Sequence, residues 1–95
     1  MEYSLILDRE LTTKRPEGGI IEMVELIQRG DGKWQINVRV SWRAGETFIV
    51  GHHNIKDIKL YSYAFSALRH IVADYHYLGQ ISVWPTRDTL PKQYF

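Results

Sequence analysis

The sequence predicts an α+β fold, an antiparallel meander sheet of four to five strands with one α-helix packed on one face. Residues 34–42 alternate between apolar and polar side chains without a break, as in a half-buried strand. Turn-forming glycines separate this segment from its neighbours, and residues 62–78 repeat apolar side chains at helical spacing. These three observations together favour a sheet followed by a covering helix.

The strand at 34–42 is the most regular part of the chain. Its apolar positions are Trp34, Ile36, Val38, Val40 and Trp42, and the residues between them are polar. Because side chains alternate between the two faces of a sheet, the apolar set should face the core and the polar set the other side.

Four further segments have strand character: residues 3–8, 20–28, 46–51 and 81–84. The segment 20–28 is β-branched and apolar but does not alternate cleanly, which predicts a bulge or burial on both faces. Gly30-Asp31-Gly32 should form the hairpin into the strand at 34–42, because glycine tolerates the backbone conformations that tight turns need.

The helix is expected to begin after Ser62 as N-cap and to end near Leu78, with Gly79 just beyond its end. One side of it should cover the sheet. That predicted core stripe consists of Tyr61, Ala64, Phe65, Leu68, Ile71, Val72 and Tyr75.

Length and composition predict one domain over residues 1–95, with a folded core at 1–84 and a tail at 85–95. The chain has no cysteine, which excludes disulfides and thiolate metal sites. No stretch approaches the length of a membrane span, and the first residues lack a signal sequence, so we expect a cytoplasmic protein without membrane contact. A net charge of +1 does not require a nucleic-acid partner.

The chemistry-bearing residues do not form a recognised catalytic or metal motif. His52 and His53 are adjacent and would point apart in an extended chain, and His70 with Asp74 lacks a third helical ligand, so we expect no metal and no cofactor. Ser66, His70 and Asp74 share a helical side, but neighbours on one exposed helix provide no oxyanion hole. We therefore expect a protein that is not an enzyme.

The outer face of the helix is the predicted functional surface. Its residues are spaced three and four apart and include two tyrosines. Tyrosines are more typical of a protein contact than of a helix face exposed only to solvent. They are Tyr63, Ser66, His70, Asp74 and Tyr77. The hypothesis is a non-enzymatic protein-interaction module, a small accessory or inhibitor protein of a bacterium or mobile element, whose partner is another protein or a second copy. The alternative reading of this face is coverage by Trp84, Tyr94 or Phe95 from the tail.

Nucleic-acid binding through the polar side of the sheet is the alternative function. The residues that would make these contacts are Lys33, Gln35, Asn37, Arg39 and Arg43. Single-strand binders also need aromatic side chains on that face, whereas Trp34 and Trp42 alternate with the core valines.

Three segments of the chain carry a family resemblance. They are the hairpin Gly-Asp-Gly-Lys-Trp, the following Arg-Ala-Gly-Glu-Thr-Phe, and Ser-Ala-Leu-Arg-His-Ile in the predicted helix. Over residues 3–84 the chain resembles small bacterial ββββα domains in which such a hairpin precedes an alanine- and leucine-rich helix. It departs from them in the longer connector at 52–60 and the tyrosine-rich helix. The resemblance implies the fold and no functional residues.

Overall fold

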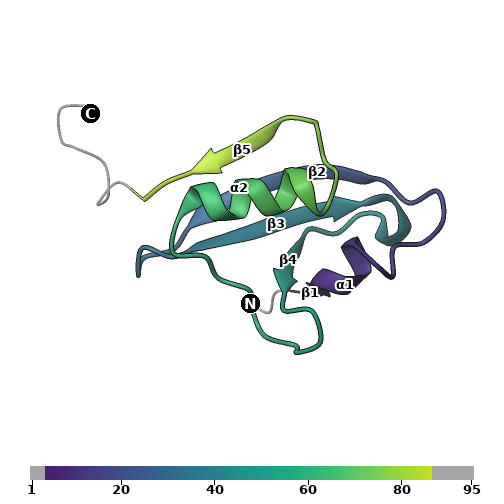
Figure 1. Ribbon diagram of the computed structural model, residues 1–95, viewed down its shortest axis with the longest axis horizontal. Coiled ribbons are helices and arrows are strands. Elements are labelled where there is room, and N and C mark those ends of the chain that lie inside the picture. Colours follow the sequence, from purple (N-terminus) through teal and green to yellow (C-terminus); the bar gives the residue numbers. More distant parts are fainter. Residues whose placement is uncertain (1–3, 87–95) are drawn as a thin grey trace.

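The computed structural model describes residues 4–86. In this range the chain forms an α+β fold in which a five-stranded sheet is crossed on one face by a helix (Figure 1). In chain order the elements are β1 (Leu5–Leu7), α1 (Asp8–Leu11), β2 (Ile21–Gln28), β3 (Trp34–Val40), the 3₁₀ turn η1 (Ser41–Arg43), β4 (Phe48–Gly51), α2 (Ala64–Ala73) and β5 (Ile81–Trp84).

The sheet is mixed rather than an antiparallel meander, so that part of the prediction is wrong. The strand order is β1-β4-β3-β2-β5, in which β2–β3 and β3–β4 are antiparallel, whereas β1–β4 and β2–β5 are parallel. A parallel neighbour must be reached by a long connection, and α2 provides that connection before β5. Apolar periodicity identifies the strands but does not show which of them become neighbours.

The hairpin between β2 and β3 forms where the glycines predict it. Gln28 lies opposite Trp34, and Gly32 has a φ of +87°, a conformation that glycine adopts without strain. The register shifts between Ile21 and Met23, which confirms the bulge in this strand.

The alternating segment ends as a strand at Val40, two residues earlier than predicted, and Trp42 belongs to η1. Trp34 and Trp42 are nevertheless both packed against the core, as the alternation indicates. The indole N–H of Trp42 donates a hydrogen bond of 2.7 Å to the Glu10 carboxylate of α1. A side-chain contact with another element, rather than strand geometry, therefore fixes this tryptophan.

The helix α2 is shorter than predicted, and it is rotated relative to the predicted core stripe. Tyr63 rather than Ser62 occupies the N-cap position, and it makes no side-chain capping bond. Ala67 and Ile71 are fully buried, whereas Phe65 and Val72 of the predicted stripe are exposed.

The core lies between α2 and the sheet face that it covers. It is built mainly from β-branched and leucine side chains of the strands together with α1 and α2: Ile6, Leu11, Ile21, Val24, Leu26, Ile36, Val38, Val40, Phe48, Val50, Ala67, Ile71 and Tyr75.

Within residues 4–86, no helix is both long and apolar enough to cross a membrane. The predicted tail at 85–95 lies outside the described residues from position 87 onward.

Candidate functional site

The five predicted residues of the helix outer face do not form one exposed surface. Tyr63, Ser66 and Asp74 are exposed, but the His70 side chain is only 18% exposed and Tyr77 is partly buried against the core. The helix ends at Ala73, so helical spacing does not continue through Tyr77. The Tyr77 hydroxyl instead donates to the backbone carbonyl of Gln80 at 2.8 Å.

His70 belongs to a cluster around the buried carboxylate of Asp8, the first residue of α1. Its Nε2 lies 2.7 Å from Asp8 Oδ1, and the Tyr75 hydroxyl donates to the same oxygen at 2.6 Å. His53 Nδ1 lies 3.2 Å from Asp8 Oδ2, and the Lys59 ammonium is 3.8 Å from Oδ1. The Asp8 side chain is 8% exposed, so one carboxylate links α1, the connector after β4 and the C-terminal part of the α2 region.

The electrostatics of the cluster favour a charged Asp8. Burial alone raises the pKa of a carboxylate, but the hydrogen bonds from His70, Tyr75 and His53, with the Lys59 charge, outweigh it. The pKa of Asp8 therefore lies well below its ordinary value. Burial, together with the neighbouring Asp8 charge, raises the pKa of the Tyr75 and Tyr61 hydroxyls, which stay protonated.

His70 lies between two carboxylates. Its Nδ1 contacts Asp74 one turn further along, while Nε2 contacts Asp8. A general base must offer an unoccupied ring nitrogen to the proton that it removes, and neither nitrogen of His70 is turned toward Ser66. Ser66, His70 and Asp74 therefore have the residue types of a Ser-His-Asp catalytic triad but not its geometry. Among the described residues no three histidine, aspartate or glutamate side chains are arranged to hold a metal ion.

Sequence reasoning missed Asp8 altogether. The spacing of His70 and Asp74 indicated their pairing, but Asp8 lies 62 residues from His70 in the chain. No local pattern marks an aspartate at the end of a short strand as a buried partner of a distant helix.

A second feature is an exposed apolar surface on α2, β5 and the turn between them. We call it the α2–β5 surface and define it by Phe65, Val72, Leu78 and Val83, which are 68%, 47%, 87% and 49% exposed. Val83 pairs with the buried Leu26, so it lies on the sheet face that α2 covers.

The α2–β5 surface and the Asp8 cluster lie on opposite flanks of α2. At 3.6 residues per turn, Phe65 and Val72 are about 140° to 160° around the helix from His70. His70 is turned toward Asp8, which follows β1, and β1 and β5 are opposite edges of the sheet. The apolar flank of α2 therefore faces the side of the sheet whose edge strand is β5 (Figure 1).

The residues of the nucleic-acid alternative are engaged within the protein for the most part. The Gln35 amide donates to Asn37 at 2.9 Å and accepts from Arg29 at 3.3 Å. Arg43 forms a bidentate ion pair with Glu10, with contacts of 2.8 and 2.7 Å. Lys33 and Arg39 are exposed.

Comparisons of the chain with models of protein families, with curated proteins and with solved structures found no match.

Proposed function

We propose that this protein is a non-enzymatic protein-interaction module that binds its partner through the α2–β5 surface. The proposal keeps the function expected from the sequence and moves its site from the predicted outer face of the helix to the neighbouring apolar flank.

The observation that carries the proposal is the concentration of exposed apolar side chains in one part of the chain. Residues 4–86 contain nine large apolar residues that are exposed, and six of them lie between positions 63 and 84. Single exposed apolar residues are ordinary, whereas a contiguous group on adjoining elements is typical of a protein contact. Trp84, 58% exposed, extends the apolar character of the β5 edge to the other sheet face.

The edge of the sheet adds a second reason. Within the described part of the chain, β5 pairs only with β2 and so presents one row of backbone groups outward. Such an edge accepts a strand from another chain, including the same strand of a second copy about a twofold axis. A partner that covers Phe65 and Val72 would thus also reach a strand edge.

The contacts of His70 support a role other than catalysis. Both ring nitrogens contact carboxylates, and the cluster links α1 to α2 in the interior. Nucleic-acid binding has less support than a protein contact, because Gln35, Asn37 and Arg43 already bond to neighbouring side chains.

The test is the double variant Phe65→Ser, Val72→Ser, compared with wild type and with Ile55→Ser. Ile55 is 65% exposed and lies in the connector, so its substitution removes a similar apolar group outside the surface. Self-association is measured by sedimentation velocity over a range of concentrations. Association with other proteins is measured by quantitative capture from an extract of the source cells.

We expect the double variant to associate more weakly than wild type, by about 10- to 100-fold for each apolar side chain removed from the interface. Burying one such side chain contributes about 1.5 to 3 kcal/mol. Ile55→Ser should behave as wild type, and circular dichroism should show that all three proteins are folded. Equal association of the double variant and wild type would refute the proposal, as would the absence of any association of wild type.

A further inference from the structure

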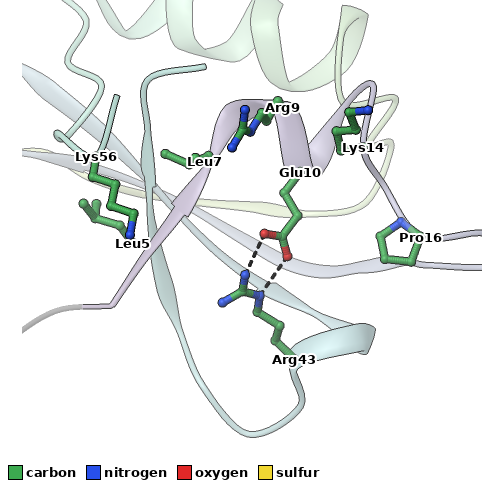
Figure 2. A pocket seen from close by; sticks show the side chains of 8 residues that line it. All are labelled: Leu5, Leu7, Arg9, Glu10, Lys14, Pro16, Arg43 and Lys56. Atoms are coloured by element: carbon green, nitrogen blue, oxygen red, sulfur yellow. Dashed lines mark hydrogen bonds and ion pairs between the residues drawn. The ribbon is translucent and has the colours of Figure 1, made fainter. Parts of the chain in front are cut away.

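A basic groove lies beside β1 and α1 (Figure 2), and β1 is the edge strand opposite β5. Its volume is about 830 Å³, and it is formed where β1, α1, the loop after α1, η1 and the connector after β4 meet. Four of its lining side chains are cationic: Arg9, Lys14, Arg43 and Lys56. Among residues 4–86, only one lining side chain, that of Glu10, is acidic.

The single carboxylate of the groove is already neutralised. Glu10 accepts both arms of the Arg43 guanidinium, as the dashed lines of Figure 2 show, and it also accepts the Trp42 indole N–H. Three of its roughly four acceptor positions are occupied, and its charge is paired with Arg43 rather than with the three other cations.

Those three cations have no acidic partner within residues 4–86. Arg9 makes one bond of 3.3 Å, to the neutral side chain of Asn54, and neither Lys14 nor Lys56 forms an ion pair there. Three uncompensated positive charges around one concave surface create a local positive potential that attracts anions, although the chain as a whole is nearly neutral.

The floor of the groove is aliphatic. Ile6 is fully buried in the core, so its neighbours Leu5 and Leu7 in β1 point to the opposite sheet face, where they line the groove with Pro16. Both leucines are partly exposed. A ligand that fits must combine negative charge with apolar side chains.

We propose that this groove binds an acidic peptide segment that carries aliphatic side chains. Carboxylates of the segment contact Lys14, Lys56 and Arg9, and its aliphatic side chains cover Leu5 and Leu7. A single-stranded nucleic acid would satisfy the charges but not the floor, because no aromatic side chain of residues 4–86 lines the groove as a surface for base stacking. The groove and the α2–β5 surface share no residue, so the two proposals stand independently.

The experiment measures the binding of a fluorescein-labelled peptide of alternating glutamate and leucine by anisotropy at low salt. The test variant is Lys14→Glu, Lys56→Glu. The matched control is Lys33→Glu, which reverses the charge of an exposed lysine that does not line the groove. Circular dichroism establishes that each variant is folded.

We expect binding by wild type, at least about tenfold weaker binding by the test variant, and binding by Lys33→Glu within about twofold of wild type. A peptide with serine in place of leucine should bind more weakly than the parent peptide, which tests the aliphatic floor without altering the protein. The Phe65→Ser, Val72→Ser variant should bind the peptide as wild type does, whatever becomes of its other associations.

Three outcomes would overturn the proposal. The first is no binding of the peptide by wild type. The second is a loss of binding free energy in Lys33→Glu of half the test variant's loss or more. Because the control reverses one charge and the test variant reverses two, that result would show that only overall charge matters. The third is a single-stranded oligonucleotide of equal charge that binds as tightly as the peptide.

Discussion

Replacing Asp8 with asparagine should destabilise the fold more than the loss of any exposed carboxylate. The substitution keeps the shape of the side chain but removes its negative charge. It also places an amide NH₂ where the carboxylate now accepts hydrogen bonds from His70, Tyr75 and His53. The donors around position 8 then face a group that satisfies fewer of them.

The magnitude follows from burial and from the number of contacts. The Asp8 side chain is 8% exposed, so solvent screens its contacts little. A hydrogen bond to a charged group contributes about 1.5 to 3 kcal/mol, and breaking a buried charged network by removing one member costs about 3 to 5 kcal/mol. We expect Asp8→Asn to lower the free energy of unfolding by about 3 to 5 kcal/mol, a large part of the roughly 5 to 14 kcal/mol typical of a chain this long.

Urea unfolding followed by tryptophan fluorescence measures the effect, with two matched controls. Asp74→Asn removes the other carboxylate that contacts His70, but its side chain is 54% exposed, so the loss should be about 1 kcal/mol or less. Glu22→Gln alters an exposed carboxylate in β2 and should change stability by less than about 0.5 kcal/mol. A loss below about 1 kcal/mol for Asp8→Asn, or one no greater than that for Asp74→Asn, would refute the assignment of Asp8 as the centre of the cluster.

Three further predictions concern the same interior and its surroundings. Folding lowers the pKa of Asp8 from its ordinary value of 3.8, so its contribution is complete above that value and is lost as the pH falls below about 4. Urea midpoints should show the difference between wild type and Asp8→Asn shrinking on acidification, and a constant difference would contradict this. Tyr75→Phe keeps the buried ring but removes the 2.6 Å bond to Asp8, which should cost about 1.5 to 3 kcal/mol in the same assay; no measurable loss would argue against that bond. Gly19→Ala would place a Cβ 2.6 Å from the Trp42 ring and should cost about 1 to 3 kcal/mol, whereas Gly30→Ala meets open space and should be nearly neutral. Equal stabilities of these two alanine variants would contradict the close approach at Gly19.

The elements were predictable because their patterns are local. Alternation from Trp34 to Val40 indicates β3, and glycine at position 32 indicates the hairpin. Neighbour relations in the sheet were not predictable in this way. The parallel pairs β1–β4 and β2–β5 join segments far apart in the chain, and no residue in either strand specifies its partner.

The helix shows how a small geometric error changes a functional interpretation. Helical spacing alone favoured a stripe that included Phe65 and Val72, because these two residues lie within an arc of about 120° with the other apolar residues of the stripe. Contacts with the sheet bury Ala67 and Ile71 instead, and the Asp8 cluster draws His70 inward. The predicted protein-contact face therefore lost His70 to the interior, and the exposed apolar flank came to light only in the folded structure.

The sequence by itself determined that this protein combines a sheet with a covering helix and that it has no cysteine chemistry. Each of these follows from composition or from periodicity within a single element. Only the tertiary structure decided that Asp8 organises the interior and that Phe65 and Val72 are exposed. It also decided that Arg9, Lys14 and Lys56 line one groove, in which Glu10 is paired with Arg43. These arrangements depend on side chains from distant segments meeting in space, and neither charge nor hydropathy along the chain specifies which of them meet.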